Sequence, residues 1–214
     1  MKQLVIIGAR GWGREVWNMA AHDIPAFIGG EMGIKGFLDD KRGAFSGLRG
    51  EYPPILSSVE SYEPEEDDVF VCALGDCAYR KKYADMILSK GGQFISLISP
   101  MARVNATARI GIGSIVCPWS AVSDNVNLGD FAMVHSYSNL GHDVTVGKYC
   151  SIESHVFCGG GAQIGDMCTL HVRSAILPRK KIGDNVTVGF GSVVMRNVAS
   201  GLHVFGNPAK RIDF

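Results

Sequence analysis

Residues 140–170 read LGHDVTVGKYCSIESHVFCGGGAQIGDMCTL, and an apolar residue returns in this stretch at every sixth position. The same spacing extends in both directions, from Ile98 to Val194, and every residue in this column except Cys158 is aliphatic. A second column, four residues after the first, holds small or β-branched residues throughout, apart from Lys180. A six-residue period sustained over this length predicts a repeat architecture and excludes an amphipathic helix, whose period is near 3.6.

Each six-residue unit is interpreted as a short strand and a turn, with the aliphatic residue pointing inward and the small residue packed beside it. Three such units make one coil of 18 residues, and stacked coils lie about 4.8 Å apart. Each coil buries its core against the next. The repeat therefore predicts a three-sided parallel β-helix over residues 98–198, in which residues 18 apart in the sequence are neighbours.

The first hundred residues have a different pattern, in which apolar strands alternate with helical segments. Alternation of this kind predicts a small parallel α/β sheet. The expected domains are therefore a Rossmann-like domain at 1–97, the β-helix at 98–198 and a C-terminal tail at 199–214. Strands are expected at 3–7, 34–38, 69–74 and 94–98, and helices at 14–21 and 78–88.

Composition narrows the classes of partner. The chain has 21 Lys and Arg residues against 21 Asp and Glu residues, so no field of one sign favours nucleic acid or an anionic membrane. No apolar stretch approaches the roughly 18 residues needed to span a bilayer. The six cysteines form no zinc-binding spacing. We expect a soluble cytoplasmic protein that binds no nucleic acid and does not span a membrane.

A glycine-rich turn follows the first expected strand. Gly8, Gly11 and Gly13 precede a helical stretch, an arrangement that suits a phosphate group at a helix N-terminus. Their spacing is not the dinucleotide fingerprint, although Asp39 stands near the place of a ribose-binding acid. Tight backbone packing explains the same glycines equally well, so the turn by itself leaves both interpretations open.

Taken together, these features resemble a known family. The repeat is similar to that of the hexapeptide-repeat acyltransferases. With an N-terminal domain that carries the glycine-rich turn and Phe37-Leu38-Asp39-Asp40, the chain resembles their sialic acid O-acetyltransferase, bacillosamine N-acetyltransferase and perosamine N-acetyltransferase branch. The resemblance implies a left-handed β-helix, a homotrimer with active sites between subunits, acetyl-CoA as co-substrate and a nucleotide-linked amino sugar held by the first domain. It implies candidate nucleotide contacts at Gly11, Gly13, Asp39, Asp40 and Gly75. Trp12 departs from the family, in which histidine often occupies this position.

The resemblance also implies a catalytic pair. His142 and Asp143 match the His-acid pair of the family, and Gly160 lies one coil further on, between Gly159 and Gly161. We expect His142 to act as the general base, Asp143 to hold its tautomer or raise its basicity, and a backbone N–H near Gly160 to stabilise the oxyanion. The plainer alternative is that His142 is a solvated turn residue.

The expected acetyl-CoA contacts lie elsewhere in the second half. Ser151 occupies the place where relatives carry a second histidine that contacts the acetyl group. Lys210 and Arg211 belong to a segment that resembles the family's closing Gly-x-Pro-Ala-Lys motif and can approach the CoA phosphates. The glycines at 159 and 161 open the backbone to the co-substrate. Solvated chain-end residues are the alternative for the basic pair.

The predicted function is acetyl-CoA-dependent N-acetylation of a nucleotide-linked amino sugar by direct transfer, with no metal. O-acetylation of a sialic-acid-like sugar is the nearest alternative. A column of His135, Glu153 and His171, 18 residues apart, leaves a metal-dependent hydratase of carbonic anhydrase type as an alternative from another class, although zinc would favour three histidines. A non-catalytic scaffold is the remaining alternative, and it leaves the column of His142 and Gly160 unexplained.

Overall fold

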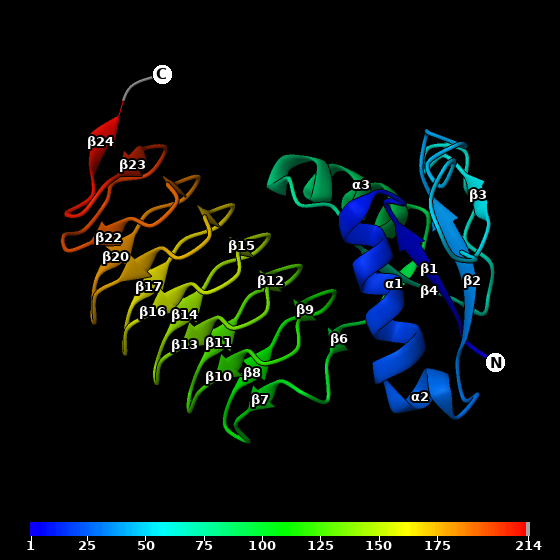
Figure 1. Ribbon diagram of the computed structural model, residues 1–214, viewed down its shortest axis with the longest axis horizontal. Helices are drawn as coiled ribbons and strands as arrows, with labels where there is room; N and C mark the ends of the chain where they lie inside the picture. The colour runs from blue at the N-terminus through cyan, green and yellow to red at the C-terminus, as the bar shows by residue number, and fades with distance from the viewer. Residues whose placement is uncertain (213–214) are drawn as a thin grey trace. The chain divides into compact units, whose positions relative to one another are not determined.

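The structure is a computed structural model that describes residues 1–212. The chain divides into two compact units, Met1–Leu97 and a second unit that begins at Ile98. Figure 1 shows the first unit as helices around a sheet and the second as a stack of coils. The division falls where the sequence pattern changes from alternating helices and strands to the six-residue repeat.

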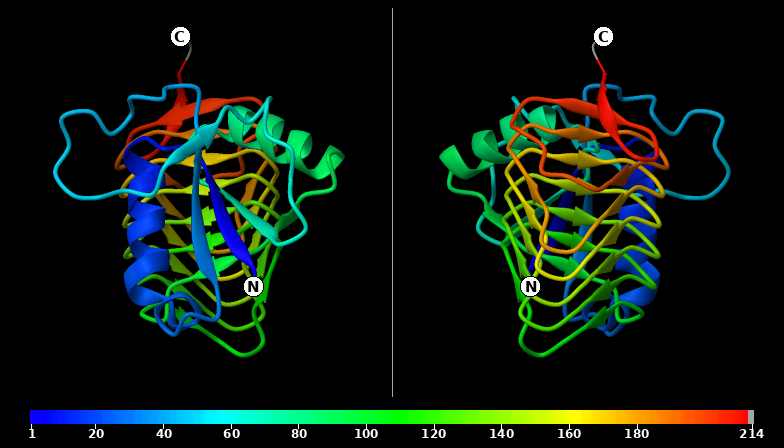
Figure 2. Two further views of the ribbon diagram at one scale, coloured as in Figure 1. Left: turned by 90° about the vertical axis from the view of Figure 1, so that its right-hand side faces the viewer. Right: turned by 90° about the vertical axis from the view of Figure 1, so that its left-hand side faces the viewer.

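The second unit is a three-sided parallel β-helix, and its coils are triangular when seen end-on (Figure 2, right). Most strands contain two residues, and strands 18 residues apart pair in parallel, as Asn139–Leu140 does with Phe157–Cys158. Three sheets form the three sides of the β-helix. The first contains β24 (Lys210–Ile212), β23 (His203–Phe205), β21 (Thr187–Val188), β18 (Thr169–Leu170), β15 (Ser151–Ile152), β12 (Met133–Val134), β9 (Ile115–Val116) and β6 (Leu97–Ile98); the second contains β22 (Val193–Val194), β19 (Ala175–Ile176), β16 (Phe157–Cys158), β13 (Asn139–Leu140), β10 (Ala121–Val122) and β7 (Arg103–Val104); the third contains β20 (Lys181–Ile182), β17 (Gln163–Ile164), β14 (Thr145–Val146), β11 (Asn127–Leu128) and β8 (Arg109–Ile110).

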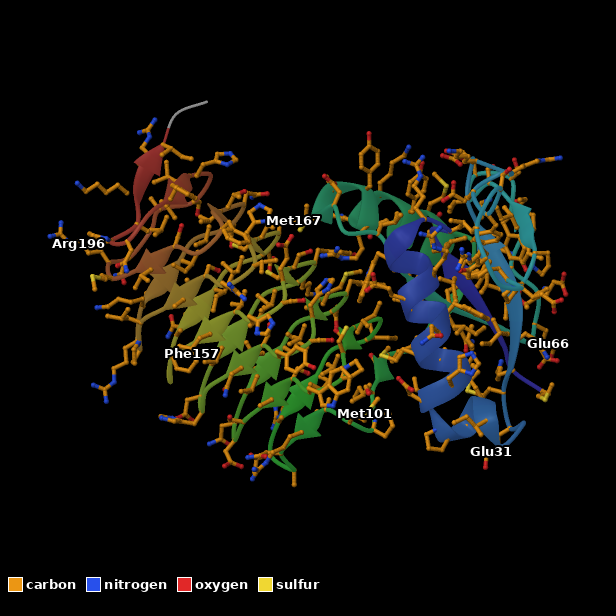
Figure 3. All side chains as sticks on the ribbon, viewed as in Figure 1. Glu31, Glu66, Met101, Phe157, Met167 and Arg196 are labelled. Carbon is orange, nitrogen blue, oxygen red and sulfur yellow. The ribbon has the colours of Figure 1, made fainter. Side chains whose placement is uncertain are left out.

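The interior of the β-helix is the pair of columns that the repeat predicts. From Val116 to Val194 every residue of the aliphatic column is at most 3% exposed, and the small residues beside it form the rest of the core. At the open first coil Ile98 is 37% exposed, because no earlier coil covers it. On β16 the residue before the inward-facing one points outward: Phe157, labelled in Figure 3, is 47% exposed. The prediction of a parallel β-helix is confirmed.

The corners of the β-helix are tight turns that use the left-handed backbone region. Asn125 and Asp143 occupy the same corner in successive coils with φ of 55° and 61°, and Gly161 follows one coil later with φ of 70°. Asn, Asp and Gly tolerate this region best. The turn geometry fixes which side chains stand at the corners, and these are the residues that carry the candidate chemistry.

The first unit is a five-stranded parallel sheet with the order β3-β2-β1-β4-β5. Its strands are β1 (Gln3–Ile7), β2 (Gly33–Leu38), β3 (Ile55–Ser57), β4 (Asp68–Cys72) and β5 (Gln93–Phe94), and its helices are α1 (Gly11–Asp23), α2 (Pro25–Ile28) and α3 (Cys77–Ser89). The order reverses between β1 and β4, so the right-handed crossovers place α1 and α3 on opposite faces of the sheet (Figure 2, left). The prediction of a Rossmann-like domain is confirmed.

Several boundaries differ from the sequence prediction. The strand expected at 94–98 is divided: β5 completes the sheet of the first unit, and β6 begins one sheet of the β-helix. The segment 199–214, expected as a tail, instead continues the β-helix as far as it is described, because β23 pairs in parallel with β21 and β24 pairs with β23. Short elements such as α2 and β3 escaped prediction because they carry too little periodicity.

Within residues 1–212, no helix combines the length and the apolar character that crossing a bilayer requires. All six cysteines are buried and unbridged. Burial raises the pKa of the Cys158 thiol to about 12, so this side chain behaves as a core residue and not as a nucleophile.

Candidate active site

His142 and Asp143 form a hydrogen-bonded pair at one corner of the β-helix, in the turn between β13 and β14. The His142 Nδ1 atom lies 2.8 Å from Asp143 Oδ2. Their side chains are 73% and 57% exposed, so both are open to a substrate. The turn itself is held by the Asp143 backbone N–H, which donates to the Asp124 carbonyl at 2.9 Å.

The pairing decides which ring nitrogen can act as a base. The His142 imidazole, and after it the Asn125 amide, hold the pKa of the Asp143 carboxyl below its usual value. An ionised carboxylate can only accept, so Nδ1 of a neutral His142 carries the proton and Nε2 keeps its lone pair. In the neutral ring, the arrangement therefore presents the Nε2 lone pair toward the next coil.

Gly160 lies against that nitrogen. A Cβ atom at residue 160 would stand 2.5 Å from His142 Nε2, so only glycine leaves room for the ring in this position. No group among residues 1–212 accepts a hydrogen bond from the Gly160 N–H, whereas the N–H groups at the equivalent turn position of another corner, Lys148 and Asp166, donate to carboxylates of the following coil at 2.7 and 2.8 Å. The corner thus combines a base with a backbone donor that the fold does not use.

The neighbouring glycines have local reasons for being glycine. A Cβ at Gly159 would meet the Pro178 nitrogen at 2.6 Å, and Gly161 takes the left-handed turn position. Because Gly159 and Gly161 have no side chains, they leave the backbone beside Gly160 uncovered.

Three of the expected acetyl-CoA contacts lie away from this corner in a single chain. Ser151 is buried on β15, in a different sheet from the two strands that flank His142. Lys210 and Arg211 are exposed on β24, at the C-terminal end of that same sheet. One chain therefore brings together His142, Asp143 and Gly160 but leaves the other three elsewhere.

The alternative metal column contains a contact between a carboxylate and an imidazole. The Glu153 carboxylate lies 3.1 Å from His171 Nδ1 and accepts a hydrogen bond from the Val172 N–H at 3.0 Å. No group of three or more His, Cys, Asp or Glu side chains in the described part of the chain is arranged to hold a metal ion. Glu153 acts here as a hydrogen-bond acceptor between coils.

The first unit contains a pocket of about 510 Å³ at the carboxyl ends of β1 and β4, where the strand order reverses. Ligands of open α/β sheets bind at this switch point. Of the predicted contacts, Asp39, Asp40 and Gly75 line the pocket. Asp39 also holds the glycine-rich turn, because its two carboxylate oxygens each accept a hydrogen bond, from the Ala9 and Lys41 N–H groups at 2.9 Å.

Gly11 and Gly13 do not line the pocket. Gly13 is required by packing, since a Cβ there would overlap the Gly8 carbonyl oxygen. Gly11 begins α1, whose first turn carries no acidic residue and whose N-cap, Arg10, makes no side-chain capping bond. A helix start of this kind favours an anion.

The sequence prediction missed the aromatic wall of the pocket. Tyr79 and Tyr83, one turn apart on α3, stack with ring centroids 6.4 Å apart, and both line the pocket. The floor is fixed by Arg80, which is fully buried and donates to the Leu74 and Gly75 carbonyls at 2.6 and 3.1 Å. Two tyrosines four residues apart, the first of them three residues after Asp76, were the signal that could have revealed this wall.

Comparisons with known proteins bear on the fold and on the family that the chain resembles. Residues 3–87 match the family model described as the PglD N-terminal domain. The UDP-N-acetylbacillosamine N-acetyltransferase of Bacillus subtilis is 30% identical over 122 residues, which cover 54% of this chain and 51% of that enzyme. The match thus spans about half the length of the curated relative.

Solved structures match over almost the whole chain. The acetyltransferase domain of PglB from Neisseria gonorrhoeae has 27% identity and a TM-score of 0.88, with 99% of this chain and all of that chain covered. The same domain has been solved in complex with acetyl coenzyme A. PerB from Caulobacter crescentus, in complex with CoA and GDP-perosamine, has 23% identity and a TM-score of 0.87 over 100% of this chain and 98% of its own, and supports the fold alone. The predicted resemblance and the left-handed β-helix are confirmed.

Proposed function

From this confirmed resemblance, we propose that the chain is an acetyl-CoA-dependent N-acetyltransferase that acts on a nucleotide-linked amino sugar. The observation that carries the proposal is the corner formed by His142, Asp143 and Gly160, where a base with a free Nε2 lies against a backbone with an unused N–H. Acyl transfer needs both groups close together.

The chemistry follows from their positions. The sugar amine attacks the acetyl carbonyl carbon, and a C–N bond forms while the C–S bond of the thioester breaks. His142 Nε2 takes the proton from the amine nitrogen and returns it to the departing CoA thiolate. Asp143 holds the Nδ1–H tautomer. The Gly160 N–H donates to the carbonyl oxygen as it becomes an oxyanion. Transfer is direct, because the two side chains paired at this corner, His142 and Asp143, serve as the base and its partner.

The two ligands occupy different units. The pocket lined by Asp39, Asp40 and Gly75 holds the nucleotide of the sugar. The start of α1 at Gly11, outside the pocket lining, favours its phosphates, whereas Gly13 serves packing against Gly8. The acetyl-CoA lies along the β-helix. It contacts Gly159, Gly161, Ser151, Lys210 and Arg211.

The assembly is a homotrimer with active sites between subunits. Support comes from the exposure of His142, at 73%, because a base so open to water in one chain needs a second surface to exclude solvent from the reaction. Ser151 and the basic residues of β24 lie on another sheet, so a neighbouring subunit is what brings such groups to the corner. Light scattering should give three times the mass of the chain; a monomer would contradict this assembly. The protein works in the cytoplasm, where acetyl-CoA is supplied.

The deciding experiment incubates the purified protein with acetyl-CoA and a panel of nucleotide-linked amino sugars while thiol release is followed. His142→Ala should lower kcat by about a hundredfold or more, the share that a general base contributes. An amide product survives hydroxylamine whereas an ester is cleaved, which separates N- from O-acetylation. The proposal would be overturned if no sugar in the panel caused thiol release, or if His142→Ala turned over at the wild-type rate.

A further inference from the structure

The corner that carries His142 continues into the preceding coils. Thr107, Asn125 and Asp143 stand 18 residues apart in one column, and hydrogen bonds join them in sequence. Thr107 and Asn125 are not among the acyl-transfer groups. They are the residues that could hold Asp143, and with it His142, in place.

Asp143 is held from two sides. Its Oδ2 atom faces His142 Nδ1 at 2.8 Å, and its Oδ1 atom accepts a hydrogen bond from the Asn125 side-chain amide at 3.3 Å. Each oxygen thus has one partner, which fixes the plane of the carboxylate. If the amide were removed, the carboxylate could rotate about its exposed bond and would no longer aim a lone pair at Nδ1.

Asn125 is itself anchored by the coil before it. Its backbone N–H donates to Thr107 Oγ1 at 2.9 Å, and the same hydroxyl donates to Asp124 Oδ1 at 3.1 Å. With φ of 55°, Asn125 occupies a left-handed turn that asparagine and glycine tolerate. The backbone from which the Asn125 side chain reaches Asp143 is therefore held in place by the preceding coil.

We propose that Asn125 is a positioning residue for acyl transfer, which orients the Asp143 carboxylate and through it keeps His142 in the Nδ1–H tautomer with Nε2 free. This inference rests on the proposed function, in which His142 is the base. Asn125 touches neither substrate nor reacting atoms. It acts on the reaction only through Asp143.

A purely structural role would be served by any residue that accepts the left-handed turn. Asn185 provides the comparison, because it has the same φ of 55° at another corner and its backbone N–H is likewise held, by the Asp166 carbonyl at 2.8 Å. Its side chain makes no hydrogen bond with any other part of residues 1–212. Replacing each asparagine by glycine keeps the turn and removes only the side chain.

The test compares Asn125→Gly with Asn185→Gly in the full chain. Since a well-placed general base is worth 10²–10⁴ in rate, loss of its orientation in Asn125→Gly should lower kcat by about tenfold, with KM within about twofold of wild type. Asn125→Asp, which cannot donate and repels Asp143, should lower kcat further. Asn185→Gly should match wild type. Equal kcat in all four proteins would overturn the proposal.

A second readout does not depend on turnover. The ¹⁵N shifts of the His142 ring report which nitrogen carries the proton; the wild type should show Nδ1–H, and Asn125→Gly should show a larger share of Nε2–H. An unchanged tautomer would overturn the proposal even if acetyl transfer is established. If the wild type transfers no acetyl group, the proposed function fails, and the ring shifts still decide what Asn125 does.

Discussion

At the scale of the residue, the candidate chemistry sits at corners, because the turn between two short strands points its side chains outward. The 18-residue step predicts that His142 and Gly160 are neighbours, and the structure brings the ring within contact of that glycine. The 18-residue step does not reveal in which direction the His142 ring points. The hydrogen bond to Asp143 aims Nε2 at Gly160, and that follows from turn geometry at φ of 61°.

A methyl group at residue 160 tests this contact. In Gly160→Ala the new Cβ would stand 2.5 Å from His142 Nε2, so the imidazole must swing aside. Since an exposed side chain can move at little cost, we expect the free energy of unfolding to change by less than about 1 kcal/mol. kcat should fall about tenfold or more, as orientation of the base is lost. Thermal unfolding and acetyl transfer measured on the same preparation check the prediction, and wild-type kcat would contradict it.

At the scale of the element, the repeat predicts the β-helix strands well because inward and outward residues alternate within each. The boundaries of the first unit are less well predicted. Periodicity weakens at helix ends, so α1 begins three residues before the expected 14–21 segment. The strand expected at 94–98 divides because Ile95 and Ser96 leave one sheet before β6 joins another.

Strand β17 offers a matched pair of substitutions. Ile164 is 3% exposed in the core, and the preceding Gln163 faces outward. Ile164→Ala should lower the free energy of unfolding by about 2–5 kcal/mol, because the coil stack cannot collapse around the cavity. Gln163→Ala should change it by no more than about 0.5 kcal/mol. Denaturant titrations measure both values, and equal losses would argue against the inward and outward assignment.

In the first unit, Asp68 at the start of β4 forms hydrogen bonds with side chains outside that strand. Its side chain is buried and accepts hydrogen bonds from Lys35 at 2.8 Å and from the Tyr62 hydroxyl at 2.7 Å. Burial alone would raise the pKa of this carboxyl, but the hydrogen bonds from Lys35, the Glu65 backbone and Tyr62 outweigh it and hold the pKa below its usual value.

A lowered pKa in the folded state gives stability that is present above the unfolded pKa, about 3.9, and is lost as the pH falls through the folded value. The free energy of unfolding of the wild type should therefore fall more steeply below about pH 4 than that of Asp68→Asn. At pH 7 the variant should be less stable by about 1–3 kcal/mol, because the buried Lys35 contact is weakened. Parallel stability curves from pH 7 to pH 3 would contradict this.

At the scale of the whole molecule, two units of different architecture carry two different sites. The first has a pocket at the switch point of a parallel sheet, and the second has an exposed corner with a base. We therefore expect the two ligands of the proposed reaction to bind separately, the nucleotide sugar to the first unit and acetyl-CoA to the second.

A substitution at Asp40 tests whether the two ligands bind separately. It lines the pocket of the first unit, so Asp40→Ala should weaken binding of the nucleotide sugar by about three- to tenfold, the share of one hydrogen bond. The affinity for acetyl-CoA should stay unchanged. Calorimetric titration with each ligand alone measures the two affinities. Glu31→Ala, at an exposed position outside the pocket lining and labelled in Figure 3, is the control for loss of an acidic side chain. An equal loss of affinity for both ligands would contradict separate sites.

The sequence by itself determined the β-helix, its register and the neighbours of His142, because a strict six-residue period allows only one way to bury its aliphatic column. It also determined that the first hundred residues form a parallel α/β domain. Only the tertiary structure decided that Gly11 and Gly13 stand outside the pocket while Tyr79 and Tyr83 line it. It alone revealed that Asn125 holds Asp143. The physical reason is that a repeat specifies where backbones stack, whereas the direction of each exposed side chain depends on turn torsions and on hydrogen bonds between coils that no local pattern encodes.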